Sequence, residues 1–350
     1  MTTISFARDV PSPDLVPVEE LADCAATVLA REGRTILTYG AGAGYTPLRE
    51  LIGEWFGVHP GRVLLTNGAL QGLDLLARAT ARGQTVLTEY PAYDRAYGAL
   101  LAAGASIVTA PADAEGLDPT AVEGVLMTER KPAFILTMPT FNNPTGATTS
   151  EERRQRLVTL AAQREFALVE YDPYRLLRLD GVPLPALFDL TGTQAIYISS
   201  FSKTIAPGLR VGWLIVPERL GEELAAAATG TYITPVQLGE AVVHEFITRG
   251  SFAPNLARVV DLLRARRDAM LAALDEHFAG ARWTRPEGGY FVWLELPFGT
   301  DAREVIARAD GVAAVAGTEF TATSNFVRLS YSFAAPDEIA EGVARLASAV

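Results

Sequence analysis

The sequence has 350 residues, of which 49% are hydrophobic and 20% are charged, so the chain is long enough for about two domains with buried cores. Its 41 acidic residues outnumber its 30 lysines and arginines, and the net charge of -11 repels phosphate backbones and anionic membrane surfaces. Nucleic acids and membranes are therefore not expected partners.

The numbers of cysteines and histidines bear on disulfides and metal binding. The single cysteine, Cys24, has no partner for an internal disulfide, and the three histidines are too scattered for a metal-ligand cluster. No run approaches the roughly 20 apolar residues of a membrane span, and the first residues lack the apolar core of a signal peptide. We expect a cytoplasmic protein without a metal site.

The N-terminal segment contains Pro11, Pro13 and Pro17, which predict an extended arm that must pack on another part of the protein. A helical pattern begins at about Val18, and Gly33 is expected to end it.

Short β-rich runs then alternate with helical patterns, and several of these runs are continuously apolar. They lie at residues 62–66, 84–90, 105–110, 133–139, 166–171, 194–200 and 211–216. This alternation predicts an α/β fold with three α/β/α layers around a mostly parallel sheet.

The pattern changes near Gly250, where longer helices mix with fewer strands. A long amphipathic helix is expected over residues 256–278, with further helices near Asp301 and from Pro336. We predict a large domain over residues 36–250 and a small α+β domain made of residues 1–35, which include the arm, and 251–350.

The segment from Ser199 to Gly212 is the most informative. Lys203 directly follows an apolar strand and is flanked by Ser200 and Ser202, with Arg210 a short distance on. A lysine that can lose its proton is a nucleophile toward an aldehyde, and an arginine beside hydroxyls can hold a phosphate. The turn at 66–72, which joins a strand to a helix, would add free backbone N–H groups to the same phosphate site.

Other segments carry polar or aromatic residues at the ends of predicted strands. They are Glu89-Tyr90-Pro91-Ala92-Tyr93, Asn142-Asn143-Pro144-Thr145-Gly146, the stretch 38–49 with Tyr39 and Gly40, Pro286-Glu287-Gly288-Gly289-Tyr290, and the stretch 325–330 with Arg328. In this order and spacing, these motifs together resemble the fold type I, pyridoxal-phosphate-dependent aminotransferases of class I/II. The nearest branch contains aminoadipate and kynurenine aminotransferases and MocR-type catalytic domains.

The resemblance implies pyridoxal 5'-phosphate as the cofactor and assigns a role to each motif. Lys203 would form the Schiff base with the cofactor and later move the substrate's α-proton. Tyr93 would stack on the pyridine ring, and Asn143 and Tyr174 would contact its phenolic oxygen. The phosphate contacts implied are Gly68, Ala69, Leu70, Ser200, Ser202 and Arg210.

The same resemblance implies a shared active site. Tyr39 would reach the phosphate of a neighbouring copy, so a homodimer is expected. Arg328 would hold the α-carboxylate of an amino acid substrate, because its planar fork binds a carboxylate at two points. Gly40 and Asn143 are also expected to contact the substrate.

One motif departs from the family. Relatives carry Asp three residues before the tyrosine that matches Tyr174, and that Asp pairs with the pyridine nitrogen; here Tyr171 stands at this position, followed by Asp172. Three alternatives are open: Asp172 reaches the nitrogen through a shifted backbone, Tyr171 faces it, or a distant acid substitutes. Because neighbouring strand residues point to opposite faces, we predict that Tyr171 lies nearest the nitrogen.

The arm departs as well, because Arg8 and Asp9 replace the glycine pair of relatives. Asp9 either faces a distal cationic group of the substrate or pairs with Arg8 in solvent. The first alternative would make the substrate an amino acid with a basic side chain.

The expected function is transamination of an α-amino acid. Elimination, replacement, cyclisation or decarboxylation on the same cofactor is the alternative that Tyr171 favours. A non-catalytic regulator that binds the cofactor is a further alternative, disfavoured by the presence of Lys203.

Overall fold

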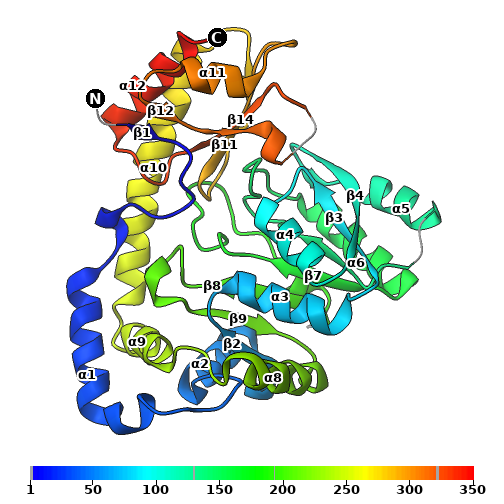
Figure 1. The fold of residues 1–350 in the computed structure, drawn as a ribbon, viewed down its shortest axis with the longest axis vertical. Coiled ribbons are helices and arrows are strands. Elements are labelled where there is room, and N and C mark those ends of the chain that lie inside the picture. The colour runs from blue at the N-terminus through cyan, green and yellow to red at the C-terminus, as the bar shows by residue number, and fades with distance from the viewer. Residues whose placement is uncertain (1–2, 129–130, 193, 321–322) are drawn as a thin grey trace.

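An eight-stranded sheet organises the larger part of the structure, a computed structural model that describes residues 3–128, 131–192, 194–320 and 323–350 (Figure 1). The sheet contains a parallel series of five strands, in the order β8, β7, β6, β3 and β4. Strand β9 is antiparallel to both β2 and β8. The predicted mostly parallel sheet is confirmed. In sheet order the strands are β2 (Val63–Thr66), β9 (Gly212–Ile215), β8 (Ile196–Ser200), β7 (Ala167–Tyr171), β6 (Phe134–Thr137), β3 (Thr85–Tyr90), β4 (Ser106–Asp113) and β5 (Gly116–Leu117).

Helices cover both faces of this sheet. Successive residues of one strand enter different apolar clusters: Val86 belongs to the cluster that includes Leu73, and Leu87 to the cluster that includes Leu157. This is why the strands are apolar without alternation. The first cluster draws on α3 (Ala69–Thr80), α4 (Asp94–Ala102) and α8 (Glu218–Tyr232), and the second on α2 (Thr46–Phe56), α5 (Pro119–Thr128), α6 (Glu151–Arg164), α7 (Leu187–Leu190) and α9 (Gln237–Thr248).

A second, four-stranded sheet lies with the C-terminal helices at the top of Figure 1. Its strands, in order, are β10 (Arg282–Trp283), β11 (Phe291–Glu295), β14 (Phe326–Ser330) and β13 (Val315–Ala316). The N-terminal strand β1 (Ile4–Ser5) pairs in parallel with β12 (Val312–Ala313), so the arm starts beside this sheet. The helices are α10 (Phe252–His277), α11 (Ala302–Arg308) and α12 (Pro336–Ala347).

Helix α1 (Val18–Ile36) starts where the sequence predicts but does not end at Gly33. Its φ and ψ angles leave the helical range only at Glu32, and the helix then continues to Ile36. Buried Ile36 packs with Val28 and with Ala241 of α9, so an apolar contact holds the last turn beyond the glycine. The domain boundaries at residues 36 and 250 remain a prediction.

Within the described residues, no helix combines the length and the apolar character needed to cross a membrane.

Candidate active site

The candidate site lies where the parallel strands end. Lys203 follows β8, Tyr171 ends β7, Asn143 lies in the loop after β6, and Tyr93 follows β3. The carboxyl ends of neighbouring parallel strands meet at one edge of a sheet, so these side chains converge. They line one cavity of about 250 Å³, together with Asp9, Val10, Ala69, Leu70, Arg95, Met138, Pro173, Tyr174, Ser200, Ser202, Pro207 and Arg210.

Lys203 lies deep in this cavity. Its Nζ lies 5.9 Å from the ring centre of Tyr174 and 5.4 Å from that of Tyr290. Burial lowers the pKa of Lys203 to about 8, and the positive charges of Arg328 and Arg210 act in the same direction. With this pKa about one-fifth of the amine is neutral at pH 7.4, far more than for an ordinary lysine, and the neutral amine is the nucleophile and base.

One end of the cavity is built to hold an anion. Gly68 has a φ of +94°, which L side chains rarely adopt, and it lies against Arg210 Nη2. A Cβ atom at Gly212 would lie 2.5 Å from the backbone nitrogen of Ala69, so this close packing requires glycine there. The first N–H groups of α3, including those of Ala69 and Leu70, have no partner within the helix. With Arg210, Ser200 and Ser202 they suit a phosphate.

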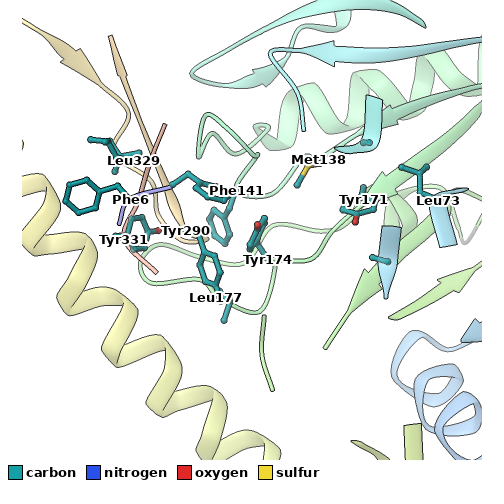
Figure 2. Close-up of a cluster of buried hydrophobic side chains, with 14 of the residues drawn as sticks. Phe6, Leu73, Met138, Phe141, Tyr171, Tyr174, Leu177, Tyr290, Leu329 and Tyr331 are labelled. Carbon is teal, nitrogen blue, oxygen red and sulfur yellow. The ribbon is translucent and has the colours of Figure 1, made fainter. Parts of the chain in front are cut away.

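Aromatic side chains form the middle of the cavity. The ring centres of Tyr93 and Tyr171 are 6.0 Å apart, and Tyr174 packs at 5.3 Å against Tyr290. Figure 2 shows Tyr174 beside Tyr290, with Tyr171 in a separate position toward Leu73. A flat ring between these side chains would gain offset or edge contacts.

Tyr171 and Asp172 face different cavities. Tyr171 lines the cavity that contains Lys203, whereas Asp172 lines a neighbouring cavity with Trp55 and Tyr197 and is absent from the first one. The structure therefore does not place Asp172 where the alternative of a shifted backbone needs it.

Arg328 contacts Asn143, a residue that lines the cavity. Its Nη1 donates to Asn143 Oδ1 at 3.0 Å and its Nη2 donates to the Ala7 carbonyl at 2.9 Å, while the buried Nε has no partner. The guanidinium lies between the rings of Phe291 and Phe320, at 4.5 and 5.0 Å. The side chain is thus fixed in orientation and keeps donor capacity for a carboxylate.

The N-terminal arm runs across the cavity. The Ser330 amide donates to the Phe6 carbonyl at 2.9 Å, and Ser332 Oγ donates to the Val10 carbonyl at 2.8 Å. Figure 2 shows Phe6 next to Leu329 and Tyr331. These contacts bring Asp9 into the cavity, where its backbone carbonyl accepts a hydrogen bond from Lys203 Nζ.

Five of the predicted residues do not line this cavity: Gly68, Asp172, Arg328, Tyr39 and Gly40. Tyr39 is 79% exposed, and a Cβ atom at Gly40 would lie 1.5 Å from Gln237 Nε2, so Gly40 allows α9 to approach. Neither residue lines the chain's own cavity.

Comparison with known proteins agrees with this geometry. The family model for aminotransferase class I and II matches residues 9–346. The chain belongs to this family. A 2-aminoadipate transaminase of Thermus thermophilus is 40% identical over 99% of this chain and 90% of its own length, and aromatic-amino-acid aminotransferase 1 of Thermococcus litoralis is 33% identical over 99% and 88%. The crystal structure of the α-aminoadipate aminotransferase LysN from Thermus thermophilus, complexed with N-(5'-phosphopyridoxyl)-L-leucine, superposes with a TM-score of 0.94 at 40% identity, covering 99% of this chain and 92% of that one.

The cofactor of this aminotransferase is pyridoxal phosphate, and the cavity fits it. The anion end suits the phosphate, the tyrosines suit the ring, and the lowered pKa of Lys203 suits reaction with the aldehyde. No group of three or more His, Cys, Asp or Glu side chains in the described part of the chain could hold a metal ion.

Sequence reasoning did not assign five of the cavity residues to the site: Val10, Pro173, Pro207, Met138 and Arg95. The last two have long side chains that can contact a ligand. Met138 directly follows β6, and Arg95 is the second residue of α4, directly after Tyr93 and Asp94. Their positions at the end of a strand and the start of a helix could have indicated that they belong to the site, since side chains at these positions face the carboxyl edge of the sheet.

Proposed function

We propose that this aminotransferase acts on an α-amino acid with a basic side chain. The observation that carries the proposal is that Asp9, an acidic residue of the arm, lines the cavity. Its negative charge opposes ionisation of the Tyr93 and Tyr174 phenols and supports the charged form of Lys203, so it acts on residues around the whole cavity.

The alternative in which Asp9 pairs with Arg8 has no support. The Arg8 guanidinium lies over the ring of Phe333, at 4.4 Å from its centre, and the described residues include no ion pair of Asp9. A carboxylate that lines a cavity without an ion-pair partner gains from a cationic one, and a substrate ammonium or guanidinium group would supply it.

The bound cofactor supplies an aldehyde for the amino group and a ring that withdraws electrons from Cα. The chain supplies the rest: Arg328 holds the α-carboxylate, Lys203 takes the proton from Cα, and the arm and small sheet exclude water. The names of the three relatives support transamination over the alternative reactions.

A panel of amino acids tests the substrate class. We expect the keto acids of L-lysine and L-arginine to form faster than those of L-norleucine and L-2-aminoadipate, with kcat/KM measured by chromatography. Norleucine matches the lysine chain without its amine, so it isolates the charge. Faster turnover of aminoadipate than of lysine would exclude a basic substrate.

Replacing Asp9 by Asn should reduce the ratio of kcat/KM for lysine over norleucine by about tenfold or more, because a charge-assisted hydrogen bond is lost. Asp94→Asn is the matched control, since Asp94 is a nearby exposed carboxylate that does not line the cavity. An unchanged ratio in Asp9→Asn would refute the role of Asp9.

We further propose that two copies form a dimer in which each contributes Tyr39 to the other's site. Exposed apolar side chains gather beside the anion end: Tyr39, Leu37 and Val236 are 79%, 67% and 52% exposed. The Val236 amide donates to Asn67 Oδ1 at 2.9 Å, and Asn67 also accepts from Arg210 through its carbonyl. This exposed surface therefore adjoins the proposed phosphate site.

Mixing two inactive variants tests this arrangement. If Tyr39 acts across the dimer, Tyr39→Ala and Lys203→Ala chains refolded together should recover about a quarter of wild-type activity, because half of the dimers are mixed and each has one intact site. Each variant refolded alone is the control. A monomeric protein, or no recovery on mixing, would contradict the proposal.

A further inference from the structure

Tyr171 lines the cofactor cavity, and its hydroxyl is free to bond a ligand there. The side chain is 5% exposed, yet its hydroxyl makes no hydrogen bond with any of the described residues. The ring is held by its contact with Tyr93 and by the strand pairing of Tyr171 with Ile198. A ligand in the cavity that accepts a hydrogen bond from this hydroxyl would gain a favourable contact.

Asp172 cannot take this place. Its backbone amide donates to the Ile198 carbonyl at 2.8 Å and its carbonyl accepts from Ser199 Oγ at 2.6 Å, which fixes the strand register. Its carboxylate accepts from the Arg175 amide and from Tyr197 Oη, both at 3.0 Å. Moving this carboxylate into the cofactor cavity would break all four hydrogen bonds.

Glu89 does not take this place either. Glu89, near the end of β3, is 2% exposed and uses its oxygens to accept from the Met138 amide at 2.6 Å and from Thr137 Oγ1 at 2.9 Å. Among the described residues that line the cavity, Asp9 of the arm is the only carboxylate, and Lys203, Arg95 and Arg210 are the cations.

The place of Tyr171 relative to Lys203 indicates which cofactor atom it meets. In pyridoxal phosphate the ring nitrogen lies opposite the carbon that carries the aldehyde, so it faces away from the lysine. Tyr174 lies close to Lys203 Nζ, whereas Tyr171 occupies the separate position toward Leu73 that Figure 2 shows. Tyr171 thus lies on the side of the cavity toward which the nitrogen points.

We propose that the Tyr171 hydroxyl donates a hydrogen bond to the pyridine nitrogen of the cofactor and that this nitrogen carries no proton. The inference rests on the cofactor and activity given above. Burial raises the pKa of the Tyr171 phenol well above its usual value, with the charge of Arg210 opposing this rise, so the phenol stays a neutral donor. A neutral donor and a nearby guanidinium both disfavour a pyridinium cation.

An uncharged pyridine withdraws fewer electrons from the substrate's Cα. Proton transfer then depends more strongly on Lys203, which must remove the α-proton and deliver it again without delay. Tyr171 would therefore act directly on the cofactor and set the electronic state of its ring.

Nitrogen-15 NMR of the protein loaded with ¹⁵N-labelled pyridoxal phosphate tests this directly, without turnover. We expect the wild-type signal in the range of an unprotonated pyridine between pH 6 and pH 9. Tyr171→Asp should move it to the pyridinium range, and Tyr171→Phe should leave it unprotonated with a smaller shift from loss of the hydrogen bond. If Tyr171→Asp does not fold, Tyr171→Phe still decides between a bonded and an unbonded nitrogen.

Tyr197→Phe is the matched control, because it removes a phenol on the other face of the same strands and should leave the signal unchanged. A pyridinium signal in the wild type, or no shift in Tyr171→Phe, would overturn the inference. Failure of the proposed substrate class is a separate result, because a low kcat/KM for L-lysine relative to L-norleucine would leave the nitrogen-15 signal of the bound cofactor unchanged.

Discussion

Replacing Lys203 by Ala is expected to reduce transamination by about 10⁴-fold, because the variant loses the group that moves the α-proton and the covalent tie to the cofactor. Cofactor binding should persist, since Arg210, Gly68 and the first turn of α3 form the anion end independently of the lysine. Keto acid formation and the amount of bound cofactor, measured on the same sample, separate the two effects.

The pH dependence of cofactor capture checks the same residue. Because burial lowers the pKa of Lys203 to about 8, its ammonium form dominates at lower pH and its reactive amine at higher pH. The rate at which cofactor-free protein takes up pyridoxal phosphate should therefore rise with pH and level off above about pH 8. A rate that keeps rising to about pH 10 would show an ordinary exposed lysine, and activity retained in Lys203→Ala would exclude its role.

The strands and the lysine could be predicted from sequence because their signals are local. Continuous apolar runs identified β6, β7 and β8, and the family resemblance assigned Lys203 and Asn143 to one site. The structure places both at the edge where these parallel strands end. The facing of Tyr171 followed from the two-residue period of a strand.

Other features depend on contacts between distant segments and could not be read locally. Helix α1 passes Gly33 because Ile36 packs on Ala241 of α9. The arm reaches Lys203 because small-sheet residues Ser330 and Ser332 bind its backbone. Arg95 does not belong to any of the sequence motifs that identified the site.

Replacing Arg328 by Lys should lower kcat/KM for amino acids by about 100-fold, because a point charge loses one charge-assisted hydrogen bond and the orientation of the planar fork. The structure makes this residue sensitive: Phe291 and Phe320 hold the guanidinium plane, and Asn143 fixes one end of it. A lysine would keep the charge but not these contacts. Steady-state rates with L-lysine and L-norleucine measure the loss.

A substrate without the α-carboxylate shows whether the loss arises at that group. Arg328 also donates to the Ala7 carbonyl, so its replacement could act by loosening the arm. If Arg328 binds the carboxylate, wild type and variant should turn over 1,5-diaminopentane, the amine that corresponds to lysine, at equal low rates. Arm closure is needed for both compounds, whereas carboxylate binding is needed only for L-lysine. If Arg328→Lys lowers the rate with this amine as much as with L-lysine, the variant acts by loosening the arm.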